Sequence, residues 1–319
     1  MYYWLQKLIP SLAKSKVAKT ALSALPNSSE NKITRQYADS HSIFTKFEPW
    51  EGVVPAYFDV TPYGSFIRRS FYDFSEHESE RRHKKVLPVK SEEYFEWIDL
   101  LEAIDSAKEK FTMVELGAGY GRWLVQAGVI LRDQKKIPFN LIGVEAESNH
   151  FKMMQQHFID NGLNPNEHVL IQGAINDTEG SVYFTEGHSK EWWGQAIIPT
   201  KDTKIGDWPK ATVKEIPAYS ISKILEKVDH VDLMDIDIQG AEAKAIRSST
   251  SALDSKVRRI HIGTHSHKNE EELHDIFSKL GWICCNNFPC FNTIETHYGP
   301  ITFEDGVQTW INPHVVTKT

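Results

Sequence analysis

The run from Val114 to Gly121, with the sequence VELGAGYG, constrains the fold more than any other stretch of the chain. The largely apolar residues 111–114 lead into Glu115, three glycines follow at alternate positions, and an amphipathic stretch begins near Arg122. Glycine permits positive φ and lets a ligand approach the backbone without a Cβ in the way. We therefore predict a strand, a tight turn and the start of a helix.

The spacing of the glycines separates two classes of ligand. A dinucleotide fingerprint reads G-x-G-x-x-G, whereas Glu115, Gly117, Gly119 and Gly121 give acid-x-G-x-G-x-G. A carboxylate just ahead of the loop repels a phosphate and attracts an ammonium group. The pattern favours a cofactor with an amino-acid end, for which S-adenosylmethionine is the obvious candidate. A structural turn in another kind of α/β protein is the alternative interpretation of this motif alone.

Composition and charge narrow the classes of function. The chain has 319 residues and a formal net charge of −7, which argues against the broad basic surface of a nucleic-acid-binding protein. No run approaches the roughly 20 apolar residues that span a bilayer. The three cysteines, Cys284, Cys285 and Cys290, follow neither a CxxC nor a paired zinc pattern. We interpret them as reduced thiols and predict a cytoplasmic protein.

The N-terminal part differs from the rest in composition. Residues 1–25 carry four lysines among apolar residues, which is typical of a basic amphipathic segment that touches a membrane surface or a partner. We favour the alternative, a terminal helix packed on the body or a partly ordered tail. A signal peptide fits poorly because lysines interrupt the apolar run. A turn-rich linker near residue 26 and scattered aromatic residues over 50–90 complete an N-terminal extension, assigned to residues 1–91.

From residue 92 onward, strands and helices alternate, which predicts a doubly wound, mostly parallel sheet over residues 92–319. Residues 186–218 are interpreted as a long irregular loop. The helix that stops at Gly281 is expected to begin with a capping box of Asn269 and Glu272. Ligands in such sheets bind at the carboxyl ends of the strands. We expect strands at 111–114, 139–145, 169–174, 181–184, 231–238, 260–265, 298–303 and 307–311.

Two further strand ends complete a nucleoside site. Glu145 ends the second strand, where an acid in nucleoside-binding sheets accepts hydrogen bonds from ribose hydroxyls. Gly173 and Ala174 end the third strand, where exposed backbone groups could contact the edge of an adenine. The alternative interpretations are structural: Glu145 could be an exposed acid after a strand, and Gly173 and Ala174 could form a simple turn. Together with the glycine loop, the three strand ends predict a site for adenosine joined to an amino acid.

The segment 235–242, with the sequence DIDIQGAE, is the second strong signal. Side chains alternate along a strand, so Asp235 and Asp237 are expected on one face, roughly 6.5–7 Å apart. Their candidate roles are a base for the methyl acceptor, a contact to the cofactor or part of a metal site. The bland alternative is that one of them caps the helix that begins near Gly240.

His265 ends the next strand. We therefore expect it at the same rim, by which we mean the edge of the sheet where the carboxyl ends of the parallel strands meet. A histidine beside a carboxylate is a competent general base near neutral pH, although a lone histidine is more often structural. Trp193 and Gln195 lie in the long loop, where an aromatic face and an amide could contact a sugar or another acceptor. Trp193 could equally be part of the core.

These residues carry a family resemblance. The glycine motif, Glu145, the DIDIQGAE run and the turn that begins at Asn176 resemble the FkbM-type class I methyltransferases over about residues 92–285. The resemblance implies a seven-stranded, Rossmann-like S-adenosylmethionine fold and, usually, O-methylation of hydroxyls on sugars or secondary metabolites. It implies that the glycine loop with Glu115 holds the methionyl part, Glu145 the ribose and Ala174 the adenine edge. The family commonly has lysine where this chain has Asp235, so no role of that lysine carries over.

We therefore predict an S-adenosylmethionine-dependent O-methyltransferase with a small-molecule or carbohydrate acceptor. The alternatives are an N-methyltransferase acting on nucleic acid or protein, and a non-catalytic cofactor-binding module; the acidic charge disfavours nucleic acid. A divalent metal is an option that the sequence does not predict, and a homo-oligomer stays open. The expected site residues are Asp237 and His265 for catalysis, Glu115, Gly117, Gly119, Gly121, Glu145, Ala174 and Asp235 for the cofactor, and Trp193 and Gln195 for the acceptor.

Overall fold

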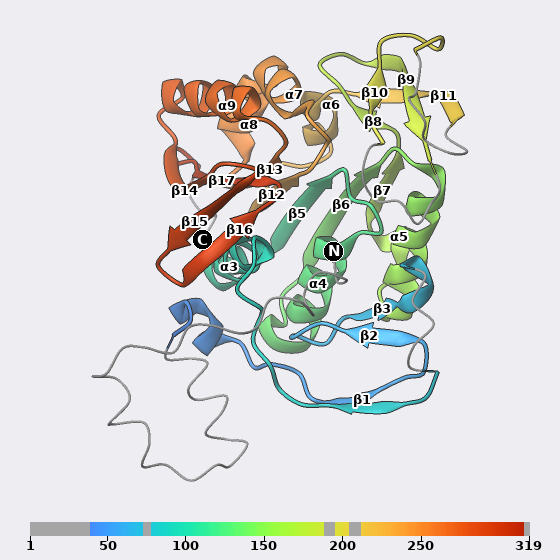
Figure 1. Cartoon of the computed structure of the whole chain (residues 1–319), viewed down its shortest axis with the longest axis vertical. Helices are drawn as coiled ribbons and strands as arrows, with labels where there is room; N and C mark the ends of the chain where they lie inside the picture. The colour runs from blue at the N-terminus through green and yellow to red at the C-terminus, as the bar shows by residue number, and fades with distance from the viewer. Residues whose placement is uncertain (1–38, 73–77, 188–194, 204–211, 316–319) are drawn as a thin grey trace.

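A seven-stranded sheet forms the centre of the molecule (Figure 1). The computed structural model describes residues 39–72, 78–187, 195–203 and 212–315. Five neighbouring strands run parallel, and the strand β17 runs antiparallel to both of its neighbours. This architecture confirms the predicted doubly wound, mostly parallel sheet. The strands, in their order across the sheet, are β14 (Ile283–Phe288), β17 (Gly306–Ile311), β13 (Arg259–Thr264), β12 (Leu233–Ile236), β5 (Phe111–Leu116), β6 (Phe139–Glu145) and β7 (Val169–Gln172).

Helices cover both faces of this sheet, and each face has its own apolar core (Figure 1). All six residues of β5 are buried, as expected for a parallel strand that is packed on both sides. Met113 points into one core and its neighbour Val114 into the other. The first face carries α3 (Glu93–Ser106), α4 (Arg122–Ile130) and α5 (Ser148–Asp160), and the second carries α6 (Ile221–Leu225), α7 (Glu242–Ser248), α8 (Thr250–Lys256) and α9 (His267–Lys279).

The described part of the N-terminal extension packs against the first face. Phe44 and Tyr63 belong to the same apolar core as α3 and α4. Arg68 makes a two-pronged ion pair with Asp160 at the end of α5, at 2.5 and 2.7 Å. The domain boundary at residue 91 stays a prediction, and the lysine-rich residues 1–25 lie outside the described residues. The elements here are η2 (Ser42–Lys46), β1 (Gly52–Val54), β2 (Phe58–Val60), β3 (Phe66–Arg68), η3 (Arg69–Phe71) and β4 (Arg81–His83).

A smaller, four-stranded sheet follows β7 and lies beside its carboxyl end (Figure 1). Its order is β10-β9-β11-β8, with β8 (Ala174–Ile175), β9 (Gly180–Glu186), β10 (Ile197–Ile198) and β11 (Thr212–Tyr219). The predicted irregular loop over 186–218 is therefore wrong for β10 and β11. Pro217 and the exposed polar side chains of β11 concealed this strand, because proline is rare inside sheets. The predicted strand 169–174 is likewise two strands, divided at Gly173.

The expected capping box of α9 is also wrong. The N-cap is Ser266, whose hydroxyl accepts a hydrogen bond from the N–H of Asn269 at 3.2 Å. Asn269 lies in the first helical turn, where its side chain binds elements outside the helix. Gly281 follows the helix with φ of 74°, in agreement with its predicted role as a stop.

The C-terminal part closes the sheet with antiparallel strands, and strands form close to the expected positions 298–303 and 307–311. In chain order, β14 is followed by a separate hairpin of β15 (Asn292–Thr296) and β16 (Gly299–Phe303), and then by β17. Within the described ranges, no helix has both the length and the apolar character needed to cross a membrane.

Candidate active site

The glycine loop joins β5 to α4 in the predicted strand–turn–helix arrangement. Gly117, Gly119 and Gly121 have φ of 79°, 55° and 69°, values that side chains disfavour. At Gly117 an added Cβ would overlap the carbonyl oxygen of Asp237 and stand 2.8 Å from its carbonyl carbon. The loop is therefore packed against the segment that follows β12, and this close approach requires glycine.

Glu115 is buried below the loop. Its carboxylate accepts hydrogen bonds from the N–H groups of Trp123 at 3.3 Å and Leu124 at 3.1 Å, in the first turn of α4. Burial, together with the nearby charge of Asp235, holds the pKa of Glu115 well above its usual range. The carboxylate thus fixes the start of the helix relative to the strand. Its remaining acceptor capacity suits an ammonium group, whose charge would compensate for this burial.

Glu145 ends β6 and lies directly beside the glycine loop. One carboxylate oxygen accepts the N–H of Gly119 at 2.7 Å, and the other accepts the N–H of Glu147 at 2.7 Å. Burial raises the pKa of Glu145 to about 8, although both N–H groups favour the charged form. The two strand ends that the sequence assigns to one cofactor are therefore in contact.

Glu147, which the sequence analysis did not single out, has a different role on the same rim. Its fully buried carboxylate caps α5 and accepts hydrogen bonds from the N–H groups of Asn149 at 2.8 Å and His150 at 2.6 Å. An acid directly before the first helical residue, Ser148, is the signal that could have identified it.

The third strand end meets this rim at Gly173 and Ala174. The N–H of Gly173 donates to the carbonyl of Glu145 at 2.9 Å, and Ala174 is buried at the start of β8. Gln195 is buried just before β10, beside the small sheet. Trp193 lies outside the described residues, so the acceptor contacts assigned to Trp193 and Gln195 stay predictions.

The two aspartates of the DIDIQGAE run occupy different environments. β12 ends at Ile236, two residues before the predicted end. Asp235 lies within the strand and is buried, and burial with the charges of Asp237 and Asp99 holds its pKa well above the usual range. Asp237 lies just beyond the strand, and 51% of its side chain is exposed. Asp237 is therefore the member of the pair that can contact an acceptor.

His265 follows β13 and forms a cluster with Asp237. Its Nε2 lies 3.2 Å from Oδ1 of Asp237, and its Nδ1 lies 3.0 Å from Oε1 of Glu242. A third carboxylate, that of Asp305, lies 3.8 Å from Nε2. Burial lowers the pKa of His265, but the hydrogen bonds to Asp237 and Glu242 outweigh this effect and raise it to about 10. The imidazole is therefore protonated at neutral pH.

Glu242 and Gln239 belong to this cluster, although the sequence analysis gave neither a role. Glu242 is fully buried and also accepts the N–H groups of Ile238 at 3.2 Å and Gly240 at 3.0 Å. The N-cap of α7 is Ala241 and receives no side-chain hydrogen bond, so neither aspartate has the capping role considered as the alternative. Gln239 has φ of 55°, and its side-chain amide donates a hydrogen bond to Oδ1 of Asp237 at 3.1 Å. A strained residue thus directs its amide at the expected catalytic carboxylate.

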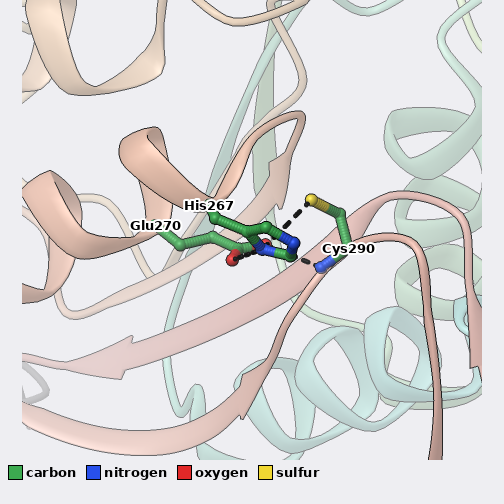
Figure 2. A group of neighbouring side chains, drawn as sticks. All are labelled: His267, Glu270 and Cys290. Carbon is green, nitrogen blue, oxygen red and sulfur yellow. Dashed lines mark hydrogen bonds and ion pairs between the residues drawn. The ribbon is translucent and has the colours of Figure 1, made fainter.

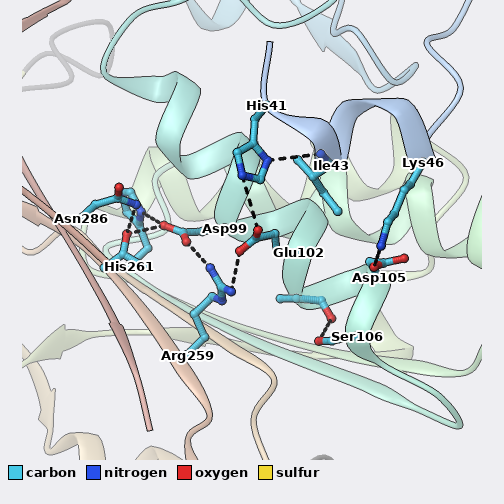
Figure 3. Close-up of polar contacts among 12 residues, drawn as sticks. His41, Ile43, Lys46, Asp99, Glu102, Asp105, Ser106, Arg259, His261 and Asn286 are labelled. Carbon is cyan, nitrogen blue, oxygen red and sulfur yellow. Dashed lines mark hydrogen bonds and ion pairs between the residues drawn. The ribbon is translucent and has the colours of Figure 1, made fainter. Parts of the chain in front are cut away.

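His261 contributes to a separate buried network (Figure 3). Its Nδ1 lies 2.7 Å from the carboxylate of Asp99 on α3, which also accepts hydrogen bonds from Arg259 at 2.5 Å and Thr309 at 2.6 Å. A cavity of about 310 Å³ lies near Arg259, where β12 and β13 begin. This network fastens α3 to the sheet beside Asp235, which pairs with His261 across β12 and β13, and we assign it a structural role.

Most residues of the rim lie in a stretch of the chain that matches a known protein family. Residues 117–287 match the family described as the methyltransferase FkbM domain. A protein of Jannaschia sp. (strain CCS1) that carries the provisional name of a methyltransferase is 27% identical over 190 residues, which are 59% of this chain and 67% of the relative.

Solved structures give looser likenesses. Methyltransferase FkbM from Methylobacillus flagellatus KT is 14% identical, with a TM-score of 0.40, over 65% of this chain and 45% of its own. Precorrin-6y C5,15-methyltransferase from Geobacter metallireducens GS-15 is 9% identical, with a TM-score of 0.39, over 70% of this chain and 89% of its own. The family match, which spans more than half of the chain, carries the assignment.

Proposed function

Because the chain belongs to the FkbM methyltransferase family, we propose that it transfers a methyl group to a hydroxyl oxygen of a sugar, glycan or secondary metabolite. The family uses S-adenosylmethionine, which supplies an electrophilic methyl group on a sulfonium centre. The finer statements, oxygen as the acceptor atom and the roles of single residues, rest on the geometry of the rim.

The rim fits this cofactor. The glycine loop is packed against the backbone of Asp237 at Gly117 and held by Glu145 at Gly119, so its backbone is fixed at the strand ends where the cofactor is expected. In our assignment Glu115 faces the ammonium end, Glu145 accepts the ribose hydroxyls, and Ala174 borders the adenine. Gly121, as the left-handed residue before α4, completes the turn.

The observation that carries the proposal is the close approach of Gly117 to Asp237. Because of this approach, the loop that we assign to the methionine end lies directly against the backbone of an exposed carboxylate, with a histidine beside it. Methyl transfer is an in-line displacement, and holding the acceptor oxygen beside the donor supplies much of the rate. A carboxylate at this position can hold the acceptor hydroxyl by its proton.

The protonation state of His265 decides which side chain can remove the proton of the methyl acceptor. Because the pKa of His265 is about 10, both of its ring nitrogens are protonated at neutral pH, and the ring cannot take a further proton from the methyl acceptor. We therefore assign proton removal to Asp237, and we assign to His265 the positive charge that orients this carboxylate. Glu242 holds the other ring nitrogen and thereby fixes the ring.

This arrangement suits a hydroxyl acceptor. A hydroxyl donates one hydrogen and accepts through its lone pairs. The carboxylate of Asp237 can accept the hydrogen of this hydroxyl. Protonated His265 and the Gln239 amide are hydrogen-bond donors that lie within 3.2 Å of the carboxylate. An oxygen atom held between these groups can lose its proton to Asp237 while its lone pair faces the methyl donor.

A screen of methyl acceptors with cofactor labelled in the methyl group tests the proposal. Nucleotide sugars and glycans are the first candidates, and the label is expected in an alkali-stable methyl ether. The matched control is the same screen with Asp237→Asn. Label on nitrogen, or equal labelling by this variant, would overturn the assignment of an oxygen acceptor or of Asp237, respectively.

The affinity for S-adenosylhomocysteine is expected to rise with pH. Glu145 must be ionised to accept two ribose hydroxyls, and burial raises its pKa to about 8 in the free protein. Below that pH, binding has to expel a proton, so the affinity falls by about tenfold between about pH 9 and about pH 7. Calorimetry measures this change. Glu145→Gln cannot ionise, so an unchanged pH profile in this variant contradicts the role of Glu145.

A further inference from the structure

A histidine, a glutamate and a cysteine converge beyond the rim, at the start of α9 (Figure 2). His267 and Glu270 lie in the first turn of this helix, and Cys290 comes from the loop that follows β14. Nδ1 of His267 lies 2.9 Å from Oε2 of Glu270 and 3.9 Å from Sγ of Cys290. The three donor atoms all lie within 4.8 Å of one another.

We propose that His267, Glu270 and Cys290 bind a single zinc ion. Imidazole nitrogen, carboxylate oxygen and thiolate sulfur are the ligand types that zinc takes in proteins. Around tetrahedral zinc, the nitrogen–sulfur and nitrogen–oxygen edges measure about 3.6 and about 3.4 Å, from bond lengths of about 2.3 Å to sulfur and about 2.0–2.2 Å to nitrogen and oxygen. The two separations measured from Nδ1 of His267 therefore need shifts of roughly half an ångström or less.

The surroundings of Glu270 support this assignment. Its other oxygen, Oε1, accepts the N–H of Cys290 at 2.7 Å and the hydroxyl of Thr264 at 2.9 Å. These bonds orient the carboxylate so that Oε2 faces His267. Hydrogen bonds that orient a ligand from behind are typical of metal sites.

The three proposed ligands are buried to different extents. Cys290 is fully buried and Glu270 is 8% exposed, whereas 59% of the His267 side chain is exposed. The exposed histidine leaves room for a fourth ligand, such as water, on the solvent side. Among the described residues two other clusters have comparable spacing, but neither includes a thiol. In the cluster at His265, both oxygens of Glu242 already accept hydrogen bonds, Oε1 from Ile238 and Gly240 and Oε2 from Asn269. In contrast, the backbone N–H of Cys290 and the hydroxyl of Thr264 both bind Oε1 of Glu270.

An ion here would join parts of the chain that border the catalytic rim. A Cβ at Gly306 would overlap both Thr264 Oγ1 and Glu270 Oε1, so the first residue of β17, which follows the turn at Asp305, packs directly on the cluster. The neighbouring residue, Asp305, is the third carboxylate near His265. Zinc would hold the start of α9 and the loop at Cys290 together, and thereby support this turn.

Cobalt substitution tests the site in the full-length chain without an affinity tag. Protein freed of metal by a chelator and then given Co²⁺ is expected to bind one ion per chain and to show a sulfur-to-cobalt charge-transfer band, which added Zn²⁺ removes. Cys290→Ser is expected to lose this band. Cys285→Ser is the matched control, because Cys285 is an exposed thiol on β14, and it is expected to keep the band.

Two further variants locate the ion and guard against misfolding. His267→Ala changes a largely exposed side chain and is expected to weaken zinc affinity by about tenfold or more while thermal unfolding of the metal-free protein is unchanged. Asp237→Asn is expected to retain the ion, because Asp237 belongs to the rim. Absence of the band from the wild-type chain, its survival in Cys290→Ser, or loss of the ion in Asp237→Asn overturns the proposal.

Discussion

Replacing Gly117 with alanine is expected to weaken the binding of S-adenosylhomocysteine by about 100-fold or more. The new Cβ would overlap the carbonyl oxygen of Asp237, at a residue whose φ is 79°. Backbone atoms cannot rotate away as a flexible side chain can, so the loop itself has to move. Such strain costs on the order of 3 kcal/mol, and a loop that relieves it by moving loses about 100-fold or more in affinity.

Calorimetry with Gly281→Ala as the control separates this collision from ordinary backbone strain. Gly281 has φ of 74°, but the nearest atom to its added Cβ, His314 Nε2, is 3.8 Å away. This variant therefore carries the same left-handed penalty at a site remote from the loop, and it is expected to bind the ligand normally. Normal binding by Gly117→Ala would show that the loop does not hold the cofactor.

Asp237→Asn is expected to lower kcat by about 10²- to 10⁴-fold while the affinity for S-adenosylhomocysteine changes little. Asparagine keeps the size of the side chain and an oxygen for the Gln239 amide, but it cannot take the acceptor proton. The backbone carbonyl that packs on Gly117 is unchanged by the substitution. The effect should therefore fall on turnover rather than on cofactor binding.

Turnover and binding are measured together for Asp237→Asn and for a matched variant, Asp229→Asn. Asp229 is exposed and precedes β12, at the opposite edge of the sheet, so its loss is expected to leave both quantities unchanged. If Asp237→Asn retains full turnover with an acceptor identified by the screen, another group removes the proton. If it loses cofactor binding as well, the residue acts through the loop.

The sheet and the cofactor rim could be predicted because their signals are local in the sequence. Left-handed glycines, buried apolar strands and acids at strand ends appear within short windows, and Gly117, Glu145 and Asp237 all lie at the expected edge. The topology then brings these strand ends together, since the carboxyl ends of parallel strands meet at one edge. This is why residues far apart in the chain could be grouped before the fold was known.

Other features depend on contacts that no local pattern reports. The role of Glu242 follows from a histidine 23 residues away, and Cys290 meets His267 across 23 residues. β11 escaped prediction because its exposed polar residues and Pro217 resemble a loop until β9 pairs with it. The protonation of His265 likewise depends on Asp237 and Glu242, which lie in an earlier segment of the chain.

The position of β17 has a consequence for how the chain acquires its fold during synthesis. β17 is the last of the seven strands in sequence, yet it lies between β13 and β14 in the sheet. β14 emerges earlier but has no partner strand until β17 exists, and β13 meanwhile presents an open edge of buried residues. Exposed strand edges of this kind pair with other chains. The growing polypeptide therefore passes through a stage that favours aggregation. This stage ends when residues 306–311 pair with β13 on one side and β14 on the other.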